Sequence, residues 1–598
     1  MGTMDSIARK KREAKSKPSN AENATTNRAG GVSFDIDDPA LKLVAMTGGS
    51  FFAEPRYYSG DAIVAARTTS ARGASMKDKF GKLEQRLKIV DGKLNGFASC
   101  EELDDVAREI VATAMSIAET DNPADLLAIA NWLRNEANIR LTPQVLLVIA
   151  SRCDSTKSLV RRYAPSIVVR PDEVKTCLMM HRFFFGYKSL ANGLAWGLCD
   201  ALSGFGERGL LKYDSSSFPT WKDVLEWLPR KNGKPLSSAV AKYFITGEVV
   251  DAKATPIIAA RKELAKCEKF EGKAFDLAKA SLVNWEVLLT QFGHTKSGKK
   301  AVWEYLLDND QVGYMALLRN LRNFHEAEIS AEHVDKVCAK ISDLEEVRKS
   351  RQLPFRFLMA HQIIEDLGGD SRRLGKLTDA IAQASNHACE NVFLPGLTVV
   401  MADNSGSMSS QISAKSQMTC AGAANSLCGI VAKASDDAYV ISFGQTMKEV
   451  RFSKNTDTVV GIARAVAGAN VGHSTNAHLG IAWMIKNNIV PDRVILLSDM
   501  QCWDSDGGWY SDGSVCDAWA KYKKVSKGAS KTWFHSVHIN GYGDNPIDAK
   551  SDKVNLVSGF SEKIIPMLLE SEGTVAGASE EAQALPTVEQ IRQKWSVS

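Results

Sequence analysis

The stretch LTVVMADNSGSM, residues 397–408, decides the fold of the second half of this 598-residue chain. An apolar, β-branched run is followed at once by Asp403, Asn404 and Ser405. A run of this kind predicts a strand buried on both faces, as in a parallel sheet covered by helices. Polar side chains just after such a strand lie where ligands bind in open α/β sheets. The stretch therefore predicts both an α/β domain and a binding site within it.

Further runs of the same character follow along the chain, at residues 438–443, 493–498 and 532–539. Segments with helical spacing lie between them, at 409–434 and 477–488. This alternation predicts a doubly wound, mainly parallel sheet with helices on both faces, over residues 392–570. The short run EVRF at 449–452 is expected to pair with 438–443 as an antiparallel edge.

Residues 34–391 have a different pattern, with apolar residues three and four positions apart. Clear examples are residues 124–134, 142–153 and 314–324. Such spacing is typical of amphipathic helices, and strand-like alternation is scarce. We therefore expect a helical array of stacked helix pairs over residues 34–391.

The ends of the chain differ from both regions. Residues 1–33 carry seven Lys and Arg against three acids and few large apolar residues, which predicts a disordered basic tail. Residues 571–598 are acidic and rich in small residues, and form either a loose tail or a single terminal helix. The start lacks the apolar segment of a secretory signal, and no apolar run is long enough for a membrane helix.

The overall composition is that of a folded protein in a reducing compartment. Hydrophobic residues make up 44% and charged residues 24%, which excludes global disorder. The eleven cysteines are scattered and include no CxxC pair, which argues against a disulfide framework and a zinc ribbon. We expect a cytoplasmic protein.

The residues after the first strand predict a metal site. Asp403, Ser405 and Ser407 form a DxSxS pattern, while Thr475 lies in a Gly-rich loop and Asp499 directly follows the run at 493–498. Two carboxylates and three hydroxyls make an all-oxygen set, which hard cations such as Mg²⁺ prefer. With so few protein anions, the cation would gain by accepting a carboxylate from a partner.

No enzyme motif emerges. GHTKSGKK at 293–300 approaches a phosphate-binding loop, but Lys300 stands where Ser or Thr should hold Mg²⁺, and a helical segment precedes it. We interpret it as a flexible basic loop. There is no GxSxG elbow, and no GxGxxG follows a strand. We expect a protein without catalytic activity.

Several helical segments mix basic and aromatic residues, at 181–196, 209–234 and 294–309. RNA bases stack on aromatic rings, while Lys and Arg meet phosphates. Individual aromatics such as Trp221, Trp227 and Trp303 are nevertheless expected in the core, and no segment outside the tail has a large net charge.

The order of segments carries a family resemblance. The DxSxS set resembles the metal-ion-dependent adhesion site of von Willebrand factor A (vWA) domains. KKAVWEYLLDNDQVGYMALLRNL (299–321) and LPFRFLMAH (353–361), followed by DNSGSM (403–408), resemble the Ro autoantigen family, in which a TROVE module precedes a vWA domain. The resemblance spans about residues 45–570 and is of bacterial or phage type.

The resemblance implies a ring of HEAT-like helical repeats closed by the vWA domain. It further implies a monomer that binds small noncoding Y RNA, receives the 3′ ends of misfolded RNA, acts in RNA quality control, and passes RNA to a 3′→5′ exoribonuclease. By the same resemblance, the RNA-binding residues expected in the helical module are Arg182, Lys188, Lys212, Lys222, Lys299, Lys300, Arg319 and Arg322. The chain departs from its relatives after residue 186, where only Lys188 is charged within KSLANGLAW.

A second function stays open on the residues alone. The chain could be a metal-dependent scaffold whose vWA domain captures an acidic protein partner, with RNA incidental. Replacement of Asp403 separates the two hypotheses, since RNA binding should survive it and partner capture should not.

Overall fold

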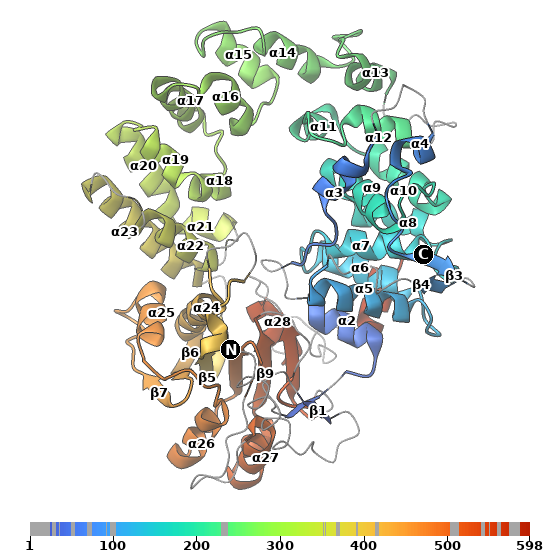
Figure 1. Cartoon of the computed structure of the whole chain (residues 1–598). Coiled ribbons are helices and arrows are strands. Elements are labelled where there is room, and N and C mark those ends of the chain that lie inside the picture. The colour runs from blue at the N-terminus through green and yellow to red at the C-terminus, as the bar shows by residue number, and fades with distance from the viewer. Residues whose placement is uncertain are drawn as a thin grey trace, which may run out of the picture. The chain divides into compact units, whose positions relative to one another are not determined.

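The chain forms two compact units in the computed structural model (Figure 1). The α/β unit comprises residues 1–54, 314–321 and 335–587, and the helical unit comprises residues 55–313, 322–334 and 588–598. The residues that the structure describes are 24–26, 32–34, 36–48, 54–68, 75–90, 93–95, 103–228, 237–350, 352, 354–365, 367, 371–389, 393–412, 418–500, 502, 514–539, 545–548, 551–558, 564–572 and 587–597.

A six-stranded sheet forms the centre of the α/β unit, in the order β10-β9-β8-β5-β6-β7. Its strands are β5 (Leu394–Asp403), β6 (Ser435–Phe443), β7 (Met447–Val450), β8 (Arg493–Ser498), β9 (Trp533–His538) and β10 (Val554–Ser558). All neighbours are parallel except β6 and β7, which are antiparallel. The predicted doubly wound α/β architecture and its antiparallel edge are confirmed.

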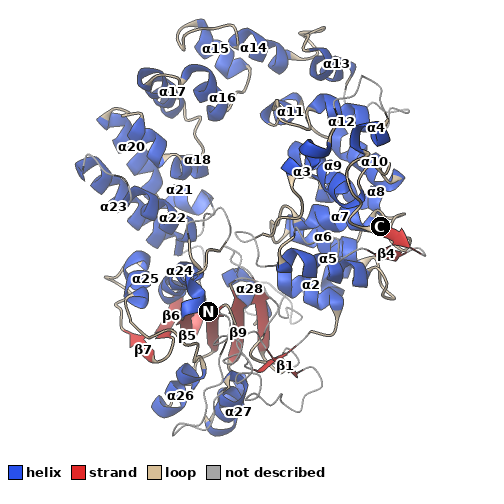
Figure 2. Ribbon diagram, viewed as in Figure 1, coloured by secondary structure: helices blue, strands red, loops and turns tan. Residues whose placement is uncertain are grey.

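Helices cover both faces of this sheet (Figure 2). They are η3 (Gly406–Ser409), α24 (Cys420–Ala434), α25 (Val459–Ala467), α26 (His478–Asn487), α27 (Val515–Val525), η4 (Ala529–Lys531) and α28 (Ile564–Ser571). On one face, Met401 and Phe443 pack in a core with Ile481 of α26 and Trp519 of α27. On the other face, α24 contacts β5, β6 and β8.

The α/β unit also holds helices from the region before the sheet. They are α2 (Pro39–Thr47), α18 (Tyr314–Arg319), α21 (Leu344–Ser350), α22 (Pro354–Glu365), α23 (Ser371–Ala388) and most of α20 (Ala331–Ser342). Helix α2 contacts β10, and α22 contacts α24. Residues 24–26 (β1) pair antiparallel with residues 32–34 (β2), so the prediction of disorder throughout 1–33 is wrong for this pair.

The helical unit consists almost entirely of helices joined by short connections. Those that precede residue 313 are α3 (Gly60–Ala66), α4 (Met76–Phe80), α5 (Asp105–Ile117), α6 (Asp125–Asn135), α7 (Thr142–Ala150), α8 (Val160–Ile167), α9 (Pro171–Phe185), α10 (Asn192–Ser203), α11 (Glu207–Lys212), α12 (Trp221–Trp227), α13 (Ser238–Thr246), α14 (Pro256–Leu264), α15 (Lys273–Ala280), α16 (Trp285–Phe292) and α17 (Lys296–Asp308). Helix α19 (Leu321–Glu326) falls mostly in this unit, and β3 (Lys88–Val90) pairs with β4 (Lys93–Asn95).

Consecutive helices pack in pairs, for example α14 with α15 and α16 with α17. The predicted array of stacked helices is confirmed, while closure into a ring stays a prediction. Trp221, Trp227 and Trp303 are buried, as expected of core residues. No helix in the described part of the chain combines the length and the apolar character needed to span a bilayer.

The last described helix, α29 (Val588–Trp595), belongs to the helical unit although it follows the sheet in sequence. It packs on α6, where Arg592 Nε and Nη2 donate to the two carboxylate oxygens of Asp125, each at 2.8 Å. Asn131 Nδ2 also donates to the backbone oxygen of Trp595 at 2.9 Å. Of the two alternatives for the C-terminal segment, the structure contains the terminal helix.

Candidate metal centre and nucleic-acid interface

Asp403 is the last residue of β5 and is fully buried. Its Oδ1 accepts a 2.8 Å hydrogen bond from the backbone N–H of Ser405, and its Oδ2 accepts a 2.5 Å hydrogen bond from Ser498 Oγ. Asn404 points elsewhere, since its Nδ2 donates to Asn425 and to Ser442. Asp403, Ser405 and Ser407 are therefore the residues of this turn that are available to a shared site.

The two serines and the Gly-rich loop meet at the same edge of the sheet. Ser405 Oγ lies 3.2 Å from Ser407 Oγ, and Ser407 is exposed. The backbone N–H of Gly406 donates to the oxygen of His473 at 2.9 Å, which holds the loop containing Thr475 against this turn. Thr475 itself is buried. The structure therefore brings the loop and the DxSxS turn together, as the sequence predicted.

Asp499 follows β8, the strand beside β5, and acts electrostatically on Asp403. Burial raises the pKa of the Asp403 carboxyl to about 7; hydrogen bonds from Ser498 and Ser405 oppose this effect, and the charge of Asp499 adds to it. A buried carboxylate beside a second one is costly without a counter-charge. A cation would supply that counter-charge.

The donors at this edge fit a hard divalent cation. Asp403, Ser405, Ser407, Thr475 and Asp499 offer only oxygens, the ligands that Mg²⁺ prefers. Among the described residues no group of three or more His, Cys, Asp or Glu side chains is arranged to hold a metal ion, so a cation here would rely on hydroxyls and water as well as carboxylates. Cation binding stays a prediction.

Arg182 is wrongly predicted as an RNA-binding residue. It is fully buried within α9, and its Nη1 donates to the backbone oxygens of Gly186 and Lys188 at 3.3 and 2.5 Å. The guanidinium lies 5.6 Å from the ring centre of Phe80 and 5.3 Å from that of Trp227. Burial, followed by the charge of Arg152, lowers its pKa to about 10. Its role is structural.

The other basic residues predicted before residue 300 reach solvent. Lys188, in the connection between α9 and α10, is exposed, as are Lys212 at the end of α11 and Lys222 in α12. Lys188 precedes the next helix, because α10 begins only at Asn192.

The prediction that Lys299 and Lys300 lie in a flexible loop is wrong. Helix α17 begins at Lys296, and the Thr295 side chain accepts a 3.0 Å hydrogen bond from the Gly298 backbone N–H as its N-cap. Lys299 is exposed, whereas Lys300 is half-buried with its Nζ 3.9 Å from Glu304.

Arg319 and Arg322 are both exposed, and they lie on two different helices. Arg319 ends α18, and Arg322 belongs to α19. Asn320 separates the helices and is buried.

Two basic residues that the sequence analysis missed, Arg208 and Arg261, lie beside Lys212 in a pocket of the helical unit. The spacing of Arg208 and Lys212, four positions apart in GERGLLK, was a usable signal for one basic helix face. Nothing in the sequence links Arg261 to that face.

The fold and the oxygen-rich edge define a chain with a helical module and a vWA-like domain. Residues 266–417 match the family model described as TROVE domain, and residues 398–569 match the model described as Ro60 vWA domain. These matches support the Ro family for this chain.

Two curated proteins are similar in sequence to parts of this chain. A Mus musculus protein named telomerase protein component 1 is 24% identical over 350 residues, which cover 48% of this chain and 13% of that protein. A Caenorhabditis elegans protein named RNA-binding protein RO60 is 28% identical over 217 residues, covering 35% of this chain and 33% of that protein. The matches thus span a third or less of these relatives.

Among solved structures, the crystal structure of the Deinococcus radiodurans RO (RSR) protein is similar, with a TM-score of 0.59 and 15% sequence identity. The match covers 90% of this chain and 99% of that one. At this identity the likeness supports the fold.

Proposed function

We propose that this chain binds RNA through the exposed basic residues of its helical unit. It would hold small noncoding, Y-type RNA and the single-stranded 3′ ends of misfolded RNA, and so act in RNA quality control. The observation that carries the proposal is the exposure of Lys188, Lys222 and Lys299 in the helical unit. Of the three, Lys299 lies within the residues that match the TROVE model. The name of the worm relative, RNA-binding protein RO60, points the same way.

The test compares two charge-matched triple variants of the full chain. Lys188→Ala/Lys222→Ala/Lys299→Ala removes three exposed cations from the helical unit. The control, Lys486→Ala/Lys527→Ala/Lys531→Ala, removes three exposed cations from the α/β unit. Affinity for a fluorescent single-stranded RNA is measured from 50 to 200 mM KCl.

Each phosphate contact contributes about 0.7 to the slope of log K against log salt for single strands. The slope of the helical-unit variant should therefore be shallower than that of the wild type by about 2, while the control should have the wild-type slope. Equal slopes in both variants would contradict the proposal.

The vWA edge supports a second candidate function, as a metal-dependent scaffold. Buried Asp403 and Asp499 would hold Mg²⁺ with Ser405, Ser407 and Thr475, and exposed Ser407 leaves the site accessible to a partner's carboxylate. The cation would supply a Lewis-acidic anchor for that carboxylate. Capture of an acidic peptide that is abolished by Asp403→Asn would favour this candidate.

We propose no catalytic activity, a cytoplasmic location, and transfer of RNA to a separate 3′→5′ exoribonuclease. Time-dependent cleavage of labelled RNA by the purified chain in Mg²⁺ would overturn the first point. For the proposed transfer of RNA, we expect the chain to speed the decay of RNA by an added exoribonuclease. The triple Lys variant of the helical unit should not speed this decay.

A further inference from the structure

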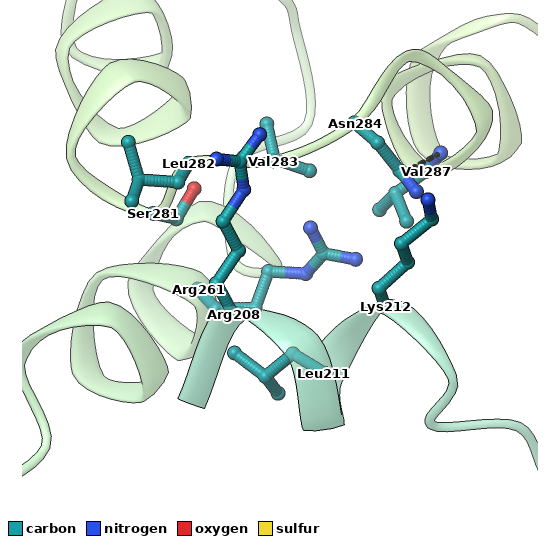
Figure 3. Close-up of a pocket in the computed structure, with 9 residues that line it drawn as sticks. All are labelled: Arg208, Leu211, Lys212, Arg261, Ser281, Leu282, Val283, Asn284 and Val287. Atoms are coloured by element: carbon teal, nitrogen blue, oxygen red, sulfur yellow. Dashed lines mark hydrogen bonds between the residues drawn. The ribbon is translucent and has the colours of Figure 1, made fainter. Parts of the chain in front are cut away.

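A small pocket lies in the helical unit between α11, α14 and the connection from α15 to α16 (Figure 3). Its cavity measures about 80 Å³. Sites for drug-sized ligands run to about 300–1,000 Å³, so this one suits a single small group. Arg208, Lys212 and Arg261 line it together with Asn284 and apolar side chains.

The basic side chains are placed by the packing of α11 on α14. Arg208 and Lys212 are four residues apart on α11 and share one face of that helix. Glu207 Oε2 accepts a 2.9 Å hydrogen bond from the backbone N–H of Ile258 in the first turn of α14. This bond ties the two helices together, and Arg261 of α14 then lies across from the α11 residues. In the view of Figure 3 the Arg208 guanidinium lies between Arg261 and Lys212.

The pocket has cations without a matching acid in its lining. No Asp or Glu is among the residues that line it, and among the described residues no ion pair joins Arg208, Lys212 or Arg261 to a carboxylate. Asp214 acts on Arg261 from a longer distance, together with Tyr243. Burial lowers the pKa of Arg261, so its charged form already lacks full solvation. Converging like charges of this kind are relieved by a bound anion.

The opposite wall is apolar and partly open. Leu282 is 48% exposed and adopts a backbone φ of +47°, a region that side chains other than Gly rarely occupy. The Asn284 side chain caps α16 by accepting a 3.2 Å hydrogen bond from the Val287 N–H. That cap uses the amide oxygen and leaves the amide NH₂ as a donor.

We propose that this pocket binds a phosphate group carried by single-stranded RNA. The guanidinium groups suit phosphate oxygens, which they engage with paired N–H donors, and the exposed Leu282 offers an apolar surface to the attached ribose or base. The choice of RNA as the carrier rests on the proposed function, whereas the choice of phosphate rests on the charges of the pocket.

The experiment uses the full chain at 200 mM KCl, where nonspecific binding is weak. Arg208→Ala/Lys212→Ala removes two exposed pocket cations, and Arg208→Lys keeps the charge without the guanidinium fork. The control, Lys253→Ala/Lys269→Ala, removes two exposed cations of the same unit that do not line the pocket. Two probes are used, a fluorescent single-stranded RNA followed by anisotropy and inorganic phosphate followed by ³¹P line broadening.

We expect the pocket double variant to lose RNA affinity by about tenfold or more, since it removes two charged donors to the bound phosphate. Arg208→Lys should show a smaller loss, and the control should stay within about twofold. Phosphate broadening should disappear in the pocket double variant alone.

Three other results would overturn the proposal. If the wild type binds RNA and the pocket variant binds it as tightly as the control does, this pocket is not an RNA-binding site, although the proposal that the chain binds RNA still holds. Phosphate binding at the pocket without RNA binding would show a free anion as the ligand and would also contradict the proposed function. If the chain binds RNA, but the pocket substitutions change neither the phosphate line broadening nor the RNA affinity, RNA binds to another surface.

Discussion

Ser498 and Asp403, which are 95 residues apart in sequence, are joined by a 2.5 Å hydrogen bond from Ser498 Oγ to the carboxylate Oδ2. The parallel pairing of β5 with β8 brings them together, because Ala402 is opposite Leu497. Ser498 therefore orients one oxygen of Asp403, while the Ser405 N–H orients the other. The candidate metal centre is thus positioned by the sheet itself.

Replacement of Asp403 by Asn should weaken divalent-cation binding by at least about tenfold, because it removes one of two carboxylates while keeping the side-chain shape. Direct titration with Mn²⁺, followed by its paramagnetic resonance signal, measures this without any functional assay. RNA affinity should stay within about twofold. Unchanged Mn²⁺ affinity would mean that the DxSxS edge does not hold a cation.

Replacement of Arg592 by Ala should destabilise the packing of α29 on α6 by about 1–3 kcal/mol, since it leaves the buried Asp125 carboxylate without its paired donors. Hydrogen exchange in α6 and α29 measures the effect. Lys594→Ala is the control: its Nζ lies 3.8 Å from Glu136 and both side chains are exposed, so the loss should not exceed about 0.5 kcal/mol. Equal protection in the two variants would show that the Arg592–Asp125 pair does not anchor α29.

Glu572 should be essential to the α/β unit. Its carboxylate accepts from Arg493 Nε and Nη2 at 2.6 and 2.7 Å, and His535 Nε2 lies 2.8 Å away. Because all three are buried, Glu572→Gln removes the counter-charge of a buried guanidinium, which costs about 3–5 kcal/mol. Urea unfolding should show this loss, and Glu449→Gln on exposed β7 should unfold like the wild type.

His181 should make the helical unit sensitive to mild acid. It is buried, and Arg152 Nη2 donates to its Nε2 at 2.8 Å. Burial, with the charges of Arg182 and Arg152, holds its pKa well below 6.5. In the unfolded chain the imidazole takes up a proton below pH 6.5, whereas the folded one stays neutral, so stability is complete above pH 6.5 and falls as the pH drops.

Between pH 7 and 5 this difference amounts to at most about 2 kcal/mol. Urea unfolding at both pH values should therefore show a smaller loss for His181→Gln than for the wild type. Identical losses would mean that His181 is protonated in the folded protein.

Most of the strands were predictable because apolar runs such as 397–402 and 493–498 are long, regular and bounded by polar residues. The meeting of Asp403 with Asp499 followed from the same rule, since parallel strands place their carboxyl ends at one edge. β10 at Val554–Ser558 was missed, because its run is short and mixed with Asn555 and Ser558.

The basic surface was less predictable, since exposure depends on tertiary packing. Arg182 lies in a basic and aromatic segment, yet the aromatic rings of Phe80 and Trp227 enclose it. Lys299 was assigned to a loop because residues 293–300 approach a phosphate-binding loop pattern without completing it, although Thr295 caps a helix there. Arg261 joins Arg208 only through the packing of α11 on α14.

The most direct test of the account is the affinity of the purified full chain for single-stranded RNA as a function of salt. The account predicts clear binding at 50 mM KCl and a linear fall of log K with log salt, with a slope of about −0.7 for each phosphate contacted. An absence of binding at 50 mM KCl, or binding that does not change with salt, would contradict it.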